Sequence, residues 1–456
     1  MRQAGSKKST GLGRLASNVQ TKVTRHCAPS LLRLSIVIAI ALSQTIPLDA
    51  VAQTTDQSAT NDATTRLRSP LRLSDVTTIA LENRAEITAA KARADALAQR
   101  PSIVSALEDP MVSVSVDHYP FQGMMEGGRR YDRSISVEQK FPLSGVLSHR
   151  RSAAVADADR ANALTAVTEL DVVLGAQRAF FMLLERRRMK PVIDEQIDLA
   201  ALLVDVAASR YASGRGTQAD VLRAEAELAR IKSKRQALDA QIRGAEAMLN
   251  AALGRPIAAE IPELAYRASL DGPGSIAEVL ELAEGRPELA AGTAEVRRAS
   301  AESRVMRSMY KPMATVKAGY AETMAEGPGA MLMVGVSIPI WRKRLSSGVA
   351  EAQAMERMAD ADLAAMRRMV AGEALAAREE VVSAQVQVNL LRQDVLPRAK
   401  VAFDAALGSY SSGQGTLFTV IDAAQALWQA QGDEVMAESA LGEAWAKLER
   451  ATGGRS

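Results

Sequence analysis

The residue types and spacings in this sequence do not indicate a catalytic site. Beyond residue 52 the chain has two histidines, His118 and His149, and no cysteine, because Cys27 lies before that point. The glycines at 214 and 216 lack the lysine of a phosphate-binding loop. An enzyme needs a nucleophile, a base and an orienting group that converge, and the sequence predicts no such set. We therefore expect neither an enzyme nor a cofactor.

One group of soft donor atoms could bind a metal ion. His118, Met124 and Met125 lie between two predicted strands. Imidazole and thioether groups suit copper(I) or silver(I), so these three residues are weak candidates for a metal site. The alternative, which we favour, is that they are loop side chains without a ligand. No resident metal is therefore predicted.

A glycine-rich motif occurs once in each half of the chain. Residues 211–217 read YASGRGT and residues 410–416 read YSSGQGT. Glycine takes the left-handed conformation that ends a helix, and threonine caps the start of the next helix. Each motif therefore predicts a tight turn between two helices. The glycines and threonines of these turns are Gly214, Gly216, Thr217, Gly413, Gly415 and Thr416.

Long helices are predicted before both turns. Residues 145–212 contain a single proline, Pro191, and residues 348–411 contain a single proline, Pro397. As helices these stretches would each span roughly 95–100 Å at 1.5 Å per residue, and each proline is expected to bend or interrupt its helix. Apolar residues at alternating three- and four-residue steps indicate coiled-coil packing. The pattern has one gap at Gln177 and one, after the first turn, at Arg235.

Four short segments alternate apolar and polar residues and predict two β-hairpins, 111–141 and 313–341. In the first segment Val112, Val114 and Val116 alternate with polar residues. Such alternation is typical of strands with one face against lipid or a protein core. Aromatic residues cluster around these segments, as they do in bilayer-interface girdles. Two soluble hairpins are the alternative.

The predicted elements follow the same order twice. The first repeat covers residues 73–254 and the second covers 275–453. Each contains a helix, a hairpin, a long helix, a turn and a returning helix. Residues 255–274, which include three prolines, are interpreted as a connector.

The N-terminal region predicts export from the cytoplasm. Residues 1–52 combine a basic region, a short apolar run and Ala50-Val51-Ala52, which is typical of a cleaved signal peptide. An N-terminal membrane anchor is the alternative. Residues 53–72 are expected to be a flexible segment. Because the signal carries most of the excess of basic residues, the mature chain is not expected to bind nucleic acid.

The number of predicted strands in one chain indicates an oligomer. Four transmembrane strands cannot close a barrel, and an open sheet edge in lipid leaves unpaired backbone groups at a cost of several kcal/mol each. Other copies of the chain must then complete the sheet. Three copies give twelve strands, an even number within the range of known barrels. Two or four copies would also close, so a homotrimer is one solution among three.

The order of elements, the paired turn motifs and the stretch Ile421-Asp422-Ala423 resemble the TolC-type outer-membrane factors. The resemblance covers about residues 70–453, and it is greatest to members that serve resistance–nodulation–division (RND) pumps, with the heavy-metal branch as a further expectation. It implies an α+β membrane protein, in which a trimeric twelve-stranded transmembrane β-barrel continues into a long periplasmic α-helical coiled-coil tunnel. The implied location is the outer membrane, with a span into the periplasm. The implied partners are a periplasmic adaptor, an inner-membrane RND pump and outer-membrane lipid.

The resemblance also implies a gate where the tube is narrowest, at its periplasmic tip. Asp422 matches a gate aspartate of the family, and Tyr410 matches a gate tyrosine. The second gate aspartate of the family falls on Thr419 here, and its gate arginine falls on Gly415. The polar network of the closed state would thus be thinner, unless Asp220 or Arg215 in the first turn substitutes.

Two further expectations concern the same tip. The glycines and threonines of the two turns are the implied docking surface for the adaptor. A ring of Asp422 carboxylates, one from each subunit, would raise the local concentration of cations. The alternative is that Asp422 only solvates the start of its helix or favours the helix dipole.

The predicted function is a passive exit duct for heavy-metal ions or drugs. The same duct in type I protein secretion is an alternative that the sequence does not separate from the first. A periplasmic coiled-coil scaffold without a channel is a third interpretation, from a different class of protein.

Overall fold

The computed structural model describes residues 67–117, 132–267, 272–323 and 326–454. All of them belong to one compact unit, Ala59–Ser456. The predicted signal peptide, most of the segment 53–72 and the metal candidates His118, Met124 and Met125 lie outside the described residues.

Helices dominate the described part of the chain. The first half contains α2 (Leu73–Asn83), α3 (Ala85–Ser105), α4 (Val146–Ala212) and α5 (Gln218–Ala252). The second half contains α6 (Ile276–Glu284), α7 (Pro287–Ser308), α8 (Arg342–Leu390), the π-helical turn η1 (Leu391–Val395), α9 (Leu396–Ser412) and α10 (Leu417–Ala451). None of the described helices combines the length and the apolar character needed to cross a bilayer.

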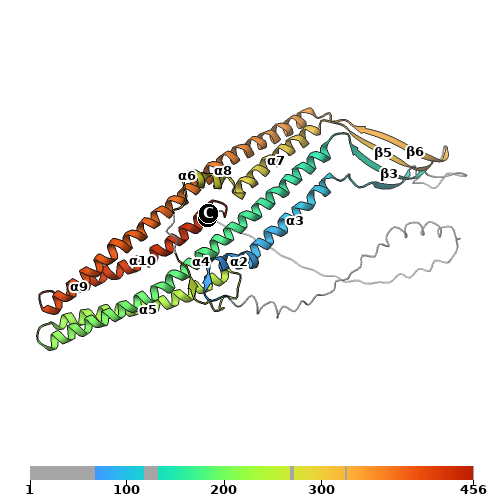
Figure 1. The fold of residues 1–456 in the computed structure, drawn as a ribbon. Helices are drawn as coiled ribbons and strands as arrows, with labels where there is room; N and C mark the ends of the chain where they lie inside the picture. The colour runs from blue at the N-terminus through green and yellow to red at the C-terminus, as the bar shows by residue number, and fades with distance from the viewer. Residues whose placement is uncertain (1–66, 118–131, 268–271, 324–325, 455–456) are drawn as a thin grey trace, which may run out of the picture. The chain divides into compact units, whose positions relative to one another are not determined.

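The longest helix, α4, connects the strands to the first turn. It has 67 residues and therefore spans about 100 Å. Helices α3, α5, α7 and α10 pack against it, and α10 also packs against α8 and α9 (Figure 1). Because α4 starts next to the strands and ends at residue 212, the strands and the first turn lie at opposite ends of this helix.

The two prolines have different consequences. Helix α4 runs through Pro191 without interruption, since the missing N–H removes one hydrogen bond from a helix that neighbours support along its length. Before Pro397 the chain instead forms the wider turn η1, in which the N–H of Leu396 donates to the carbonyl of Leu391. π-Helix is rare and occurs mostly as single turns of this kind inside α-helices.

Both gaps in the coiled-coil pattern are polar links between helices. Gln177 is buried, and its Nε2 donates to Oε2 of Glu449 at 3.0 Å. Arg235 pairs with Asp194 of α4 at 2.6 Å and with Asp239 of its own helix at 2.5 Å. Gln177 thus links α4 to α10, and Arg235 links α5 to α4.

The strands form one four-stranded antiparallel sheet. It consists of β2 (Met111–Asp117), β3 (Asp132–Pro142), β5 (Met313–Thr323) and β6 (Gly327–Ser337). The strand order is β2-β3-β5-β6, so the hairpins of the two chain halves pair through β3 and β5. Among the described residues, β2 and β6 each have a neighbour on one side only.

The register of the sheet separates an apolar face from a polar face. Val112 pairs with Val137, Val137 with Ala318, and Ala318 with Leu332, so apolar side chains form a row across all four strands. Val112 and Leu332 are 64% and 74% exposed in the single chain. The other face carries serine pairs, such as Ser113 with Ser136, whose hydroxyl oxygens lie 2.8 Å apart. An exposed apolar face of this kind is typical of a surface that contacts lipid or another protein.

The connector between the two halves packs onto the helices. Its strand β4 (Leu264–Ala265) pairs in parallel with β1 (Leu71–Arg72), at the end of the segment that was expected to be flexible. Leu71 is fully buried in a cluster with Phe180 and Phe181. Arg187 of α4 donates to the connector carbonyl of Ile261 at 2.7 Å.

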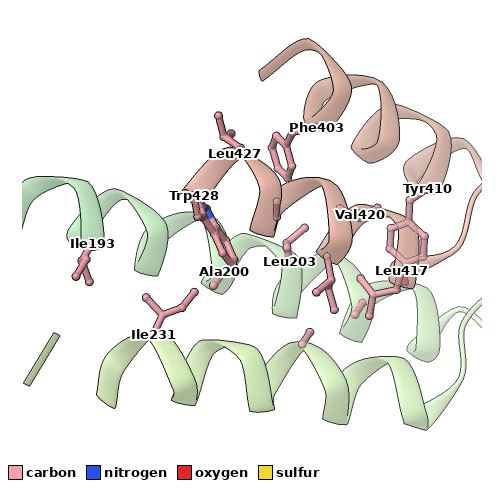
Figure 2. Packing of buried hydrophobic residues seen from close by; sticks show 14 of the residues in the cluster. Ile193, Ala200, Leu203, Ile231, Phe403, Tyr410, Leu417, Val420, Leu427 and Trp428 are labelled. Carbon is pink, nitrogen blue, oxygen red and sulfur yellow. The ribbon is translucent and has the colours of Figure 1, made fainter. Parts of the chain in front are cut away.

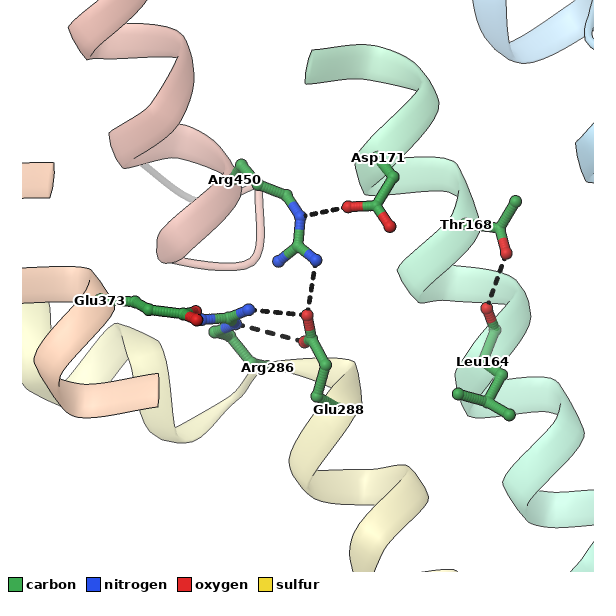
Figure 3. A network of polar contacts seen from close by, with 7 residues as sticks. All are labelled: Leu164, Thr168, Asp171, Arg286, Glu288, Glu373 and Arg450. Carbon is green, nitrogen blue, oxygen red and sulfur yellow. Dashed lines mark hydrogen bonds and ion pairs between the residues drawn. The ribbon is translucent and has the colours of Figure 1, made fainter. Parts of the chain in front are cut away.

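A network of charged side chains links α4, α7, α8 and α10 (Figure 3). Arg286, just before α7, pairs with Glu288 and with Glu373 of α8, each at 2.7 Å. Arg450 of α10 pairs with Glu288 and with Asp171 of α4, also at 2.7 Å. Burial disfavours the charge of Glu288, but the hydrogen bonds from Arg286 and Arg450 outweigh it and hold the pKa of Glu288 below its usual value.

Candidate functional site

The first glycine of each motif has the backbone conformation that its turn requires. Gly214 follows α4 with φ of +73°, and Gly413 follows α9 with φ of +83°. Only glycine adopts this left-handed region at no steric cost. The N–H of Gly413 donates to the carbonyl of Tyr410 at 3.0 Å, which closes the end of α9.

The second glycine of each motif allows the chain to pass close to the preceding helix. A Cβ atom on Gly216 would lie 3.1 Å from the backbone nitrogen of Tyr211. A Cβ atom on Gly415 would lie 3.2 Å from the backbone nitrogen of Tyr410. These distances are tighter than ordinary carbon contacts, so both turns depend on glycine for their compactness.

The threonines cap the returning helices, and the two caps differ. The hydroxyl of Thr217 accepts from the N–H of Asp220 at 3.2 Å, while Oδ2 of Asp220 accepts from the backbone N–H of Thr217, also at 3.2 Å. This arrangement is a capping box. In the second turn Thr416 accepts from the N–H of Thr419 at 3.3 Å. Asp220 and Thr419 thus hold equivalent positions, and the charge is present in the first turn only.

Arg210 connects the two turns. It is the third residue from the C-terminal end of α4, and its Nη1 donates to the backbone carbonyl of Tyr410 at the end of α9. Its Nη2 donates to the carbonyl of Arg215 at 3.1 Å. The guanidinium carbon lies 4.5 Å from the centre of the Tyr410 ring, within the range of a cation–π interaction.

Tyr410 belongs to the apolar core beneath the turns (Figure 2). It is 2% exposed and packs with Leu417 and Val420 of α10 and with Leu203 of α4. Burial raises the pKa of the Tyr410 hydroxyl and the nearby charge of Asp220 raises it further, while Arg210 acts in the opposite direction. This hydroxyl is buried with no hydrogen-bond partner among the described residues.

The equivalent residues of the first turn are placed differently. Tyr211 corresponds to Tyr410 in the motif but is 50% exposed. Arg223 of α5 lies 5.9 Å from the ring centre of Phe418 of α10, which adds a second contact between the two hairpins. The likeness of the two motifs therefore does not extend to their side-chain environments.

Asp422 lies on the exposed side of α10, in its second turn. The cap of this helix is Thr416, so Asp422 does not cap it. The structure therefore brings Tyr410, Asp220 and Arg210 together and leaves Asp422 facing solvent in the single chain. Among the described residues, no group of three or more histidine, cysteine, aspartate or glutamate side chains could hold a metal ion.

Comparison with known proteins identifies the chain. The sequence profile of the outer membrane efflux proteins matches residues 76–255 and 279–454. The chain belongs to the outer membrane efflux protein family. This efflux protein is thus an outer-membrane channel of the kind that serves tripartite pumps, and its family is one of channels rather than enzymes. The resemblance drawn from the turn motifs is confirmed.

Two curated relatives have related sequences. The efflux protein is 29% identical over 333 residues to the cobalt-zinc-cadmium resistance protein CzcC of Cupriavidus metallidurans, covering 68% of this chain and 74% of CzcC. It is 25% identical over 337 residues to the pyoverdine export outer membrane protein OpmQ of Pseudomonas putida, covering 71% of this chain and 70% of OpmQ.

Solved structures share its fold. The outer-membrane channel OprN superposes with a TM-score of 0.73 at 17% identity, over 84% of this chain and 90% of OprN. CusC gives 0.73 at 14% identity, over 84% of this chain and 92% of CusC. VceC of Vibrio cholerae gives 0.71 at 18% identity, over 84% of this chain and 96% of VceC. The efflux protein therefore has the TolC-like channel fold.

The sequence-based interpretation missed Arg210. It considered Asp220 or Arg215 as substitutes in the polar network that Thr419 and Gly415 leave thinner. The guanidinium that donates to the second turn instead comes from Arg210, the residue before Tyr211. One signal was available, because the two motifs differ at the preceding position. Arg210 precedes the first motif and Ser409 precedes the second.

Proposed function

We propose that this efflux protein is the passive exit duct of an RND-driven heavy-metal export system. The main support for a duct is the four-stranded sheet. Its apolar face is exposed, and among the described residues its outer strands each pair on one side only. The likeness to a cobalt-zinc-cadmium resistance protein supports metal ions as the cargo. An RND pump and a periplasmic adaptor are the proposed partners.

The proposed assembly is a homotrimer with a twelve-stranded barrel. Strands β2 and β6 would pair with the neighbouring subunits, which satisfies their free backbone groups in lipid. The row of apolar side chains would face the lipid, and the serine-rich face would line the water-filled lumen. The two chain halves, with their common order of elements, would then give a ring of six helical hairpins.

The proposed gate lies at the two helical turns. Arg210 holds the second hairpin against the first through the carbonyl and the ring of Tyr410. Breaking this contact would free α9 and α10 to move away from α4 and widen the tip. The charge of Asp220 lies near the Tyr410 hydroxyl, and we propose that Asp220 acts on the gate through this residue. Thr419 holds the equivalent position in the second turn but carries no charge. Asp422 of each subunit would face the pore and attract cations.

The adaptor is proposed to dock on the turns themselves. Gly214, Gly216 and Thr217 form one compact turn, and Gly413, Gly415 and Thr416 form the other. Small residues leave backbone groups accessible for a helical partner, as in other close helix contacts. Three subunits would present six such turns.

Cargo can be tested by deleting the gene and restoring it on a plasmid. We expect deletion to lower resistance to cobalt, zinc and cadmium, and the wild-type gene to restore it. Copper, silver and a dye that RND pumps export serve as comparison compounds. Unchanged metal resistance, together with loss of a secreted protein, would instead identify a secretion channel.

A further inference from the structure

A cavity of about 550 Å³ lies where the strands meet the long helices. The ends of β3, β5 and β6 and the starts of α4 and α8 surround it. Val146 and Leu345 line it and are 8% and 7% exposed, so the side next to the helices is apolar. Ile338, Ile340 and Trp341 also line it, and each is at least 67% exposed. Ile338 and Ile340 follow β6 in the register of its apolar face, so the cavity reaches that face just beyond the end of β6.

Cationic side chains also line this cavity. The cationic residues of the lining are Lys140, Arg150, Lys311 and Arg344, and its one acidic residue is Glu108. Glu108 lies 3.9 Å from the amino group of Lys140. Within the described ranges, no carboxylate lies at ion-pair distance from Arg150, Lys311 or Arg344. Three cations beside this cavity thus have no anionic partner among the described residues.

This combination matches an amphiphile with a negatively charged head. A free phosphate ion would gain nothing from the apolar lining. A purely apolar occupant would use none of the three exposed cations beside it. An exposed tryptophan next to lysine and arginine residues is typical of the membrane–water interface. In the proposed channel, the border between strands and helices faces the periplasmic leaflet of the outer membrane.

We propose that this cavity binds an anionic glycerophospholipid. The phosphate would lie among Arg150, Lys311 and Arg344, and an acyl chain would extend along Ile338, Ile340 and Trp341. The bound lipid would fasten the base of the sheet to the first turns of α4 and α8. The inference rests on the proposed membrane channel, because it requires the apolar face of the sheet to lie in a bilayer.

The test is native mass spectrometry of the full mature protein in detergent, after delipidation and addition of a defined lipid. Phosphatidylglycerol should bind the wild type, and phosphatidylcholine with the same acyl chains should bind at least tenfold more weakly. Glycerol 3-phosphate at the same concentration should not compete, since it lacks the acyl chains. The double variant Arg150→Gln/Arg344→Gln removes two cations from the proposed phosphate site. It should weaken phosphatidylglycerol binding by at least about tenfold.

A matched control keeps the test specific. The double variant Arg151→Gln/Lys343→Gln removes two exposed cations from the same helix starts, outside the cavity lining, and should bind phosphatidylglycerol like the wild type. Equal binding of both lipids, or equal loss in both double variants, would overturn the site. Channel conductance of the same wild-type preparation separates the two proposals. A conducting protein without lipid preference removes only the lipid site, and a protein that neither assembles nor conducts removes both.

Discussion

The guanidinium carbon of Arg210 lies 4.5 Å from the centre of the Tyr410 ring, although the two residues belong to different helical hairpins. The same guanidinium donates to the backbone carbonyl of Tyr410. One side chain thus contacts both the ring and the main chain of the facing helix end. In the proposed gate, separating the two turns would break this contact.

Removing this contact should open the channel. We expect Arg210→Ala to raise single-channel conductance in planar bilayers, because a cation–π contact worth about 0.5–2 kcal/mol is lost together with charged hydrogen bonds. Arg215→Ala is the matched control. Arg215 contributes only its backbone carbonyl to Arg210, so its side chain should be dispensable. Equal conductance of the wild type and Arg210→Ala would show that the contact between Arg210 and Tyr410 does not keep the channel closed.

Asp422 should control the entry of cations. In the proposed trimer, three exposed carboxylates would form a ring that attracts cations and binds divalent ions. We expect Asp422→Ala to raise conductance or to weaken block by divalent cations in planar bilayers. Asp404→Ala, which changes an exposed aspartate of α9, should do neither. If Asp422→Ala behaves like this control, Asp422 has no role in the gate.

The turns should tolerate no added bulk. We expect Gly216→Val to abolish metal resistance while the trimer remains in the membrane, because a Cβ atom there already approaches the backbone nitrogen of Tyr211 to 3.1 Å. Gly415→Val should act in the same way. Gly244→Val lies on α5, where a Cβ atom meets nothing within 4 Å, and should retain resistance. Full resistance in the turn variants would argue against docking at the turns.

The two faces of the sheet should respond differently to charge. Val114 and Ser115 are neighbours on β2 and point to opposite faces. Arginine on a lipid-facing strand position costs about 2–4 kcal/mol near the bilayer centre. We therefore expect Val114→Arg to lower the yield of heat-modifiable trimer in the membrane fraction and Ser115→Arg to leave it nearly unchanged. The reverse order would mean that the apolar face does not contact lipid.

The network around Glu288 should make stability depend on pH. The pKa of Glu288 is lowered in the folded protein, so its contribution is full above the unfolded pKa and is lost as pH falls through the folded value. We expect Glu288→Gln to lower the free energy of unfolding by about 1–3 kcal/mol at pH 7. This difference should shrink below a pH of about 4.

Thermal unfolding followed by circular dichroism at pH 7 and at acidic pH measures this effect. Glu281→Gln is the control, because Glu281 lies on the exposed side of α6. It should leave the melting temperature unchanged at both pH values. A difference for Glu288→Gln that stays constant with pH would show that its charge does not stabilise the fold.

Much of this fold could be read from the spacing of residues along the chain. The glycines of the two motifs indicated tight turns, and Gly214 and Gly413 have the left-handed conformation expected of them. Alternating valines indicated strands, and β2 carries Val112, Val114 and Val116 on its exposed apolar face. These features depend on the backbone and side-chain preferences of residues only a few positions apart, so local sequence is sufficient to predict them.

Contacts between distant segments could not be read in this way. Tyr211 and Tyr410 occupy the same place in two similar motifs, yet packing buries Tyr410 and leaves Tyr211 half exposed. The partner of Arg210 lies on another hairpin, and the cations of the proposed lipid site come from α4, α8 and the turn before β5. Side chains so far apart in the chain meet only after the helices and strands have packed. Their distances and burial are therefore properties of the tertiary structure, which local patterns do not specify.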